Sequence, residues 1–152
     1  MKTLLLLLLA SFTYAMDMDA LVKHLKFEEG YSATRYLDTR GKWTIGYGHR
    51  CSSKQPAITR EQAERILMND IKIAMDAVDE MVSDSTPEQV RFILVSMTFQ
   101  MGEGGVRDFK NMLRNINNQN YKAASVSMKR SDWKKQTPER CLRLANLMAS
   151  IR

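Results

Sequence analysis

Two acidic residues separated by a turn-forming segment are the side chains of this sequence best placed to do chemistry. Glu29 is followed by Gly30, the residue that most readily ends a helix, so its carboxyl is expected on a helix's last turn. Asp38 comes nine positions later and opens the turn-forming run DTRG. The flanking segments, Ser32 to Leu37 and Trp43 to Tyr47, are suited to strands, which predicts a hairpin with Asp38 at its tip.

Such a hairpin would place the two acidic groups on opposite sides of one fold-back, with Thr44 on the return strand able to reach the space between them. One protonated and one ionised carboxyl are the minimal machinery of glycoside hydrolysis. Structure alone also explains both residues, because glutamate before a terminal glycine and aspartate in a turn are common solvated features. Glu28 competes for the acid role, but its offset from Gly30 favours Glu29 and leaves Glu28 as a solvated neighbour.

Residues 1–15, MKTLLLLLLASFTYA, have the composition of a secretory signal peptide. Lys2 supplies the positive start, Leu4 to Ala10 the apolar run, and Thr13 to Ala15 a small-x-small ending. The apolar run is far shorter than the roughly 20 residues that cross a bilayer, which argues against a retained membrane anchor. We expect cleavage after Ala15, with a released signal-anchor as the minor alternative, leaving residues 16–152 as one domain.

The composition fits an exported globular protein with an anionic partner. The 152 residues are 44% hydrophobic and 26% charged, and the formal net charge is +6, or +5 without Lys2. This charge suits bacterial cell walls, membrane surfaces and nucleic acids, but no nucleic-acid-binding motif is recognisable. Cys51 and Cys141 allow one disulfide at most, and the sequence leaves their pairing open. The cysteines and histidines show no metal-ligand spacing, so neither a metal nor another cofactor is expected.

Helical periodicity dominates outside the hairpin. Residues 16–29 are expected as the first helix, and a Thr-x-x-Gln capping box at Thr59 opens a long helix to about residue 82. A second box over 86–89 opens a helix whose residues 90–101 are apolar on nearly every side, which predicts a buried hub ended by the glycines after Met101. Shorter helices are expected over 109–116, 121–129 and 138–150.

These motifs together resemble the phage-type lysozymes, the family of the T-even phage lysozymes (glycoside hydrolase family 24). In that family the motif is Glu, eight residues, Asp, five residues, Thr, and Glu29, Asp38 and Thr44 match it in order and spacing. Two later segments, FQMGE from Phe99 and WKKQTPER from Trp133, resemble the family's signatures of the larger lobe. The similarity therefore extends over almost the whole chain after the leader.

The resemblance implies an α+β, predominantly helical, lysozyme-like fold. A small β-hairpin lobe, about 30–58, would be joined by a connecting helix, 59–82, to a larger all-helical lobe, 86–152, which also takes in the N-terminal helix, 19–29. The active-site cleft would lie between the lobes. Compared with the T-even pattern, the region between His49 and Ile58 is much shorter, which puts the small lobe's outer strand and part of the cleft lip in question. The chain also stops at Arg152, before the last segment of those enzymes.

The activity implied is hydrolysis of the β-1,4 bond between N-acetylmuramic acid and N-acetylglucosamine in bacterial peptidoglycan, with inversion. Glu29 would be the general acid, and Asp38 with Thr44 would orient the attacking water. Inversion predicts carboxyl groups about 6.5–9.5 Å apart. Further residues would line the cleft, namely Phe99, Gln100, Arg50 and Ser127. Two supporting pairs are implied, Arg140 with Glu29 and His49 with Asp70.

Two other classes of function remain open. One is a catalytically silent wall-binding descendant, which the intact set of Glu29, Asp38 and Thr44 argues against. The other is a basic antibacterial protein that acts on membranes through a helix. For the enzyme, we expect an exported monomer without a stable membrane anchor, acting outside the cell, in the periplasm or in a digestive vacuole according to its host. Chitin shares the linkage and is an alternative substrate.

Overall fold

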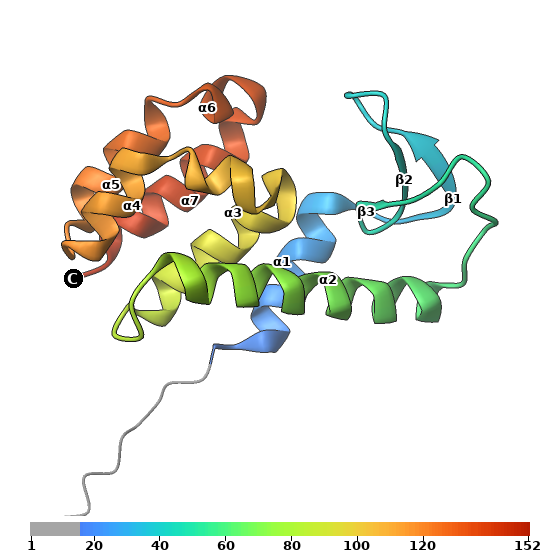
Figure 1. Cartoon of the computed structure of the whole chain (residues 1–152), viewed down its shortest axis with the longest axis horizontal. Coiled ribbons are helices and arrows are strands. Elements are labelled where there is room, and N and C mark those ends of the chain that lie inside the picture. Colours follow the sequence, from blue (N-terminus) through green and yellow to red (C-terminus); the bar gives the residue numbers. More distant parts are fainter. Residues whose placement is uncertain (1–15) are drawn as a thin grey trace, which may run out of the picture.

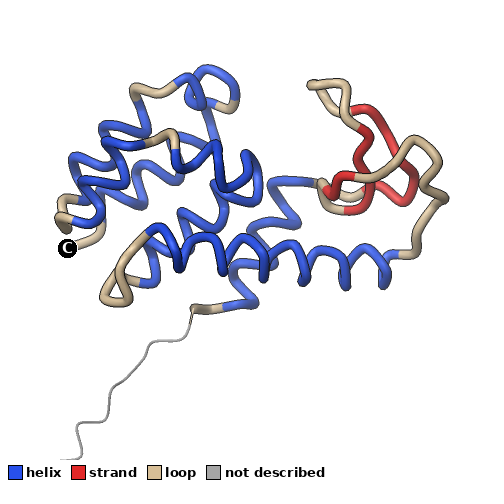
Figure 2. The backbone as a smooth tube through the Cα atoms, in the orientation of Figure 1, coloured by secondary structure: helices blue, strands red, loops and turns tan. Residues whose placement is uncertain are grey.

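The computed structural model describes residues 16–152, so the expected signal peptide lies outside the described residues. The elements in this range are α1 (Met18–Glu29), β1 (Ser32–Leu37), β2 (Trp43–Gly46), β3 (His49–Arg50), α2 (Arg60–Met81), α3 (Glu88–Arg107), α4 (Lys110–Asn117), α5 (Tyr121–Lys129), α6 (Asp132–Gln136) and α7 (Pro138–Ser150). The strands gather at one end of the molecule and helices α3 to α7 at the other (Figure 2). The predicted α+β, mainly helical fold class is confirmed.

Helix α2 runs from the sheet to the helical lobe and is the long connection between them (Figure 1). It begins with the predicted capping box, in which the Gln62 N–H donates to Thr59 Oγ1 at 3.1 Å and the Thr59 N–H donates to Gln62 Oε1 at 2.8 Å. One face of the helix is buried over its whole length, with Ala63, Leu67, Ile71, Ala74, Ala77, Val78 and Met81. Its cap and its apolar face therefore fix both where α2 begins and how it is oriented.

Helix α3 is the buried hub that the sequence predicts, with Val90, Ile93, Leu94, Val95, Ser96, Met97 and Thr98 all buried. The predicted capping box at its start is wrong. The Thr86 N–H bonds to the Ser83 carbonyl in the preceding turn, and Pro87, which has no side-chain acceptor, stands at the N-cap. The helix kinks at Gly102, where φ is 77°, and helical turns resume as far as Arg107. The apolar helix therefore ends at Gly102, as the sequence predicts, and a second short helical segment follows directly.

The small lobe is a three-stranded antiparallel sheet in the order β1-β2-β3. The predicted hairpin pairs Tyr36 with Thr44, and β3 adds Arg50 opposite Thr44. The outer strand, which the shortened sequence put in question, is present and is two residues long. The turn between β2 and β3 contributes Tyr47 to the hydrophobic core, whose other members lie in the helices, apart from Val82 just after α2.

Two further sequence questions are answered by the described residues. Cys51 and Cys141 are free thiols, with Cys141 fully buried. From Met16 onward, the structure contains no helix with both the length and the apolar character needed to cross a membrane.

The buried hub makes a stability prediction. Replacing fully buried Leu94 by alanine removes packed methyl groups and leaves a cavity, so the free energy of unfolding should fall by about 2–5 kcal/mol. Leu142→Ala is the control, because Leu142 is 38% exposed and should lose less than about 1 kcal/mol. Urea unfolding of both variants measures the difference, and equal losses would contradict the assignment of α3 as the hub.

Candidate active site

Glu29 is the last residue of α1, as the sequence predicts. The helix starts after the N-cap Asp17 and ends at Gly30, whose φ is 66° and whose N–H bonds to the Lys26 carbonyl at 3.2 Å. The Glu29 side chain lies against the turn between β2 and β3, because a Cβ added to Gly48 would come within 3.1 Å of Glu29 Oε2. Glycine at position 48 therefore makes room for this carboxyl.

Arg140 of α7 holds Glu29 from the helical lobe. Its Nη1 donates to Glu29 Oε1 at 2.8 Å, and its Nη2 donates to Ser96 of α3, at 3.0 Å to the carbonyl and 3.1 Å to Oγ. Arg140 is only 6% exposed. The resemblance implied the pair with Glu29, and the structure brings these two residues together across 111 positions of sequence. A buried guanidinium needs such a partner, because an unpaired buried charge is strongly destabilising.

Glu28 is not the solvated neighbour that the sequence suggested. Its side chain is 8% exposed, and its Oε1 accepts a hydrogen bond from Arg143 Nη2 at 2.6 Å. Its Oε2 lies 3.9 Å from Arg140 Nε. The local sequence around Glu28 does not predict this burial, because the burial depends on two arginines of α7, more than a hundred positions away.

His24 packs beside these carboxylates, with its Nδ1 4.0 Å from Glu28 Oε1. Its Nε2 lies 2.8 Å from Ser96 Oγ. Because Ser96 Oγ already accepts from Arg140, its single hydroxyl proton is available for His24 Nε2, which then acts as the acceptor. Burial lowers the pKa of His24 most strongly, the charge of Glu28 raises it, and the charges of Arg140 and Arg143 lower it.

Asp38 stands at the hairpin tip, where the backbone holds its carboxylate. Its Oδ1 accepts the N–H groups of Arg40 at 2.9 Å and Lys42 at 2.8 Å, and its Oδ2 lies 3.3 Å from Arg50 Nη1. The Lys42 N–H is the main reason that the pKa of Asp38 lies below its usual value, and the Arg40 N–H and the charges of Arg50 and Arg40 add to it. Asp38 is therefore ionised over the whole neutral range.

Three polar residues of the small lobe lie on one face of the sheet, next to Asp38. Tyr36 pairs with Thr44 and Thr44 with Arg50, so these three side chains share a face. Thr44 is buried and donates from Oγ1 to the Lys42 carbonyl at 3.1 Å. Burial raises the pKa of Tyr36, and the charges of Glu29 and Asp38 raise it further. Tyr36 thus lies near both carboxylates, a residue that the sequence reasoning overlooked although it shares the strand's period of two with Asp38.

The expected cleft-lining residues fall into two cavities. Phe99 and Arg50 line one of about 300 Å³, together with Gly48 and the pair formed by His49 Nδ1 and Asp70 Oδ2 at 2.7 Å. The resemblance implied this pair, and the structure brings it together. Glu29 does not itself line this cavity, although its carboxyl lies beside Gly48, which does.

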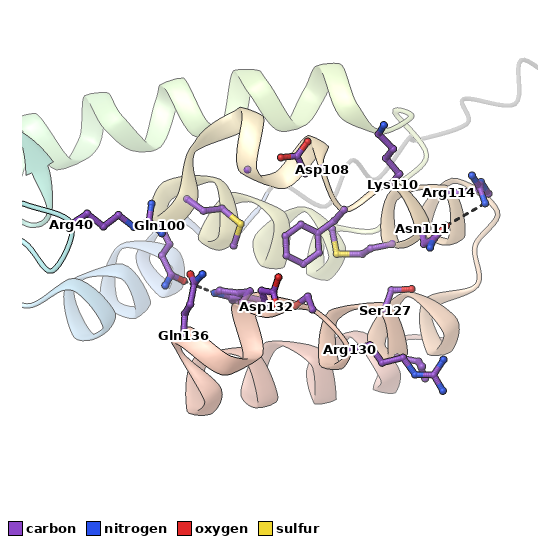
Figure 3. Close-up of a pocket in the computed structure, with 17 residues that line it drawn as sticks. Arg40, Gln100, Asp108, Lys110, Asn111, Arg114, Ser127, Arg130, Asp132 and Gln136 are labelled. Atoms are coloured by element: carbon purple, nitrogen blue, oxygen red, sulfur yellow. Dashed lines mark hydrogen bonds between the residues drawn. The ribbon is translucent and has the colours of Figure 1, made fainter. Parts of the chain in front are cut away.

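Gln100 and Ser127 line the second cavity, of about 860 Å³. Figure 3 shows Lys110, Asn111 and Arg114 of α4 on one wall. Ser127 of α5 and Arg130, just after α5, lie on the other wall, and Gln100 lies at the end toward Arg40 of the hairpin. Gln100 is fixed there, because its Oε1 accepts from Trp133 Nε1 at 3.0 Å and its Nε2 donates to Thr137 Oγ1 at 3.3 Å. The second cavity thus extends from the helical lobe toward the hairpin.

Within the described part of the chain, no group of three or more histidine, cysteine, aspartate or glutamate residues could hold a metal ion. The polar groups gathered here are those of acid and base chemistry: a paired carboxyl at a helix end, a backbone-held carboxylate, a threonine and a tyrosine.

Comparison with known proteins gives consistent matches. The family model described as phage lysozyme matches residues 26–147. Probable T4-type lysozyme 2 of Dictyostelium discoideum is 28% identical over 152 residues, covering 81% of this chain and 89% of that protein. The endolysin of Salmonella phage P22 is 30% identical over 110 residues, covering 68% of this chain and 75% of that protein. Peptidoglycan hydrolase gp36 of Pseudomonas phage phiKMV is 31% identical over 84% of this chain, which corresponds to 15% of that larger protein.

The lowered pKa of His24 makes a prediction about stability. A histidine that binds its proton less readily when folded than when unfolded costs stability as the pH falls below about 6.5. The free energy of unfolding should therefore decrease between pH 7 and pH 5, and this decrease should be smaller in His24→Gln, which keeps an acceptor for Ser96 but does not titrate. Urea unfolding at both pH values measures it. An unchanged pH dependence in the variant would show that His24 contributes nothing to it.

Proposed function

The chain belongs to the phage lysozyme family, and from that premise we propose that it is a muramidase, hydrolysing the β-1,4 bond between N-acetylmuramic acid and N-acetylglucosamine in bacterial peptidoglycan. The observation that carries the proposal is that two carboxyl groups lie near one tyrosine. The Glu29 carboxyl is at the end of α1, where Arg140 binds one of its oxygens, and the Asp38 carboxyl is at the hairpin tip, where backbone N–H groups bind one of its oxygens. A pair of carboxyl groups at one site is what most glycoside hydrolases use.

Glu29 is the proposed general acid. Arg140 occupies Oε1, so Oε2 is the oxygen free to carry a proton to the leaving group. Oε2 is also the oxygen that faces Gly48, and Gly48 lines the cavity that contains Phe99. A glycosidic oxygen bound beside Gly48 would come within reach of the proton that Oε2 donates.

Asp38 is the proposed base. Its ionised state at neutral pH suits it to accept a proton from water, and its Oδ1 is already saturated by two N–H donors, which leaves Oδ2 for that water. Thr44, on the same face of the sheet, would help to orient the water. An inverting reaction needs room for the water between the carboxyl groups, and the separation of about 6.5–9.5 Å remains our prediction.

The two cavities offer two places where parts of the glycan chain could bind. Phe99 would support a sugar ring in the smaller cavity, with Arg50 beside it, and Gln100 and Ser127 would offer polar contacts in the larger one. The larger cavity is lined mainly by charged and polar side chains, which suits the hydroxyl and amide groups of a glycan.

The activity prediction separates the two adjacent glutamates. Release of reducing ends from purified peptidoglycan should fall about 10²–10⁴-fold in Glu29→Gln and in Asp38→Asn, because each loses its proton-transfer group. Glu28→Gln is the matched control, since it removes a neighbouring carboxylate that is turned toward Arg143. It should keep activity within about tenfold of the wild type once folding is confirmed by circular dichroism.

The outcomes distinguish the alternatives. If the folded wild type binds the cell wall but releases no reducing ends, the protein is a wall-binding protein and not an enzyme. Bacterial killing that survives Glu29→Gln would point to action on membranes. Proton NMR of the first product anomer tests inversion, and retention would contradict the role assigned to Asp38.

We also propose that the protein is exported and that residues 1–15 are removed on the way. The prediction is that the full chain, expressed in a secreting host, appears outside the cytoplasm with a mass that starts at Met16. The matched variant Ala15→Lys places a charge where small residues are needed and should block processing. A mature mass that still includes residues 1–15, in a membrane fraction, would favour the signal-anchor instead.

A further inference from the structure

Arg50 was expected to line the cleft, and the structure also sets it against Asp38. Arg50 Nη1 lies 3.3 Å from Asp38 Oδ2. Arg50 ends the short strand β3, directly opposite Thr44 of β2, and the Cys51 N–H bonds to the Trp43 carbonyl at 3.0 Å just beyond it. Opposed residues of an antiparallel pair face the same side. Strand pairing therefore carries the guanidinium to the face that holds Thr44 and Asp38.

The backbone leaves a single oxygen of Asp38 for this contact. Oδ1 accepts the N–H groups of Arg40 and Lys42, and the Asp38 N–H closes the turn on the Lys42 carbonyl at 2.9 Å. With Oδ1 fixed in this way, the carboxylate has one orientation, and Oδ2 is the oxygen able to hold a water. Arg50 faces that oxygen.

We infer that Arg50 is a positioning residue for Asp38, whose guanidinium keeps Oδ2 directed into the cleft as an ionised acceptor for the attacking water. This inference rests on the proposed function, because it gives Arg50 a part in the same reaction. The separation of 3.3 Å exceeds the roughly 2.7–2.9 Å of a charge-assisted hydrogen bond, so Arg50 attracts Oδ2 without saturating it. The Asp38 side chain is 25% exposed, which leaves Oδ2 open to water.

The groups around Asp38 determine how its charge responds to pH. The Lys42 N–H lowers its pKa most, desolvation raises it, and the Arg40 N–H and the charges of Arg50 and Arg40 lower it further. Tyr36 is also nearby, because the charges of Glu29 and Asp38 both act on it. Removing the Arg50 charge raises the pKa of Asp38 and moves the acid limb of the rate profile to higher pH. Because both members of the pair are partly in solvent, the movement should be a few tenths of a pH unit.

Arg50 also borders the cavity with Phe99, so a role in binding the glycan must be separated from one in positioning. A residue that only binds substrate changes KM, whereas one that orients the base changes kcat and its pH profile. A surface ion pair without a role changes neither.

The experiment measures kcat and KM for release of reducing ends from purified peptidoglycan, from about pH 4 to pH 8, in the full chain. Arg50→Ala should lower kcat about tenfold, leave KM within about twofold, and move the acid limb upward. Arg50→Lys should restore the acid limb, because it keeps the charge, but only part of kcat, because an ammonium lacks the planar fork. Lys54→Ala, which removes an exposed positive charge from the following loop, should match the wild type.

Four results would overturn the inference. An Arg50→Ala protein with wild-type kcat and acid limb removes the positioning role, and one that changes KM alone assigns Arg50 to substrate binding. Carbon-13 titration of the Asp38 carboxyl gives an independent readout, and an identical pKa in the wild type and Arg50→Ala would contradict the coupling. A wild type that releases no reducing ends would overturn the proposed function as well, whereas an active wild type with an unaffected Arg50→Ala would overturn this inference alone.

Discussion

The buried guanidinium of Arg140 is the contact on which the geometry of the site depends. It joins α7, which carries it, to Ser96 of α3 and Glu29 of α1, so a residue near the end of the chain fixes the proposed acid near its beginning. A buried charge of this kind tolerates few arrangements, since losing either partner leaves the other without compensation in a poorly solvated place. The position of α7 is therefore part of the site, although α7 lines neither of the cavities described.

The proposed base, Asp38, is held in a different way from Glu29, so the two carboxyl groups depend on different parts of the fold. Asp38 depends on local backbone N–H groups of its own turn, which need nothing from the helical lobe. Glu29 depends on Arg140 of α7, which is itself held by Ser96 of α3. Disturbing the helical lobe would displace the proposed acid and leave the proposed base oriented. The proposed reaction accordingly needs both lobes folded, with α2 spanning between them (Figure 1).

Local signals predicted the elements well because each is decided within a few residues. The Thr59 capping box, the helix end at Gly30 and the hairpin around Asp38 all appear where the sequence places them. The pairing of Glu29 with Arg140 came only from the family resemblance, since no local pattern links residues so far apart. The burial of Glu28, the division of the cleft residues between two cavities and the contact of Arg50 with Asp38 were not predicted, because each depends on how separate elements pack.

The shortened region after His49 shows why a departure from the T-even pattern leaves the site intact. The sheet face that matters is built by β1 and β2, and β3 needs only Arg50 opposite Thr44 to complete it. The short return is tied down at both ends, by the Cys51 N–H on Trp43 and by the Ile58 N–H on the Ala33 carbonyl at 2.9 Å. A longer loop could extend the lip of the cleft, but it would add nothing to the hydrogen bonds that orient Asp38. The two-residue strand is therefore long enough for the contact with Asp38, because it needs to place only the Arg50 guanidinium beside the hairpin tip.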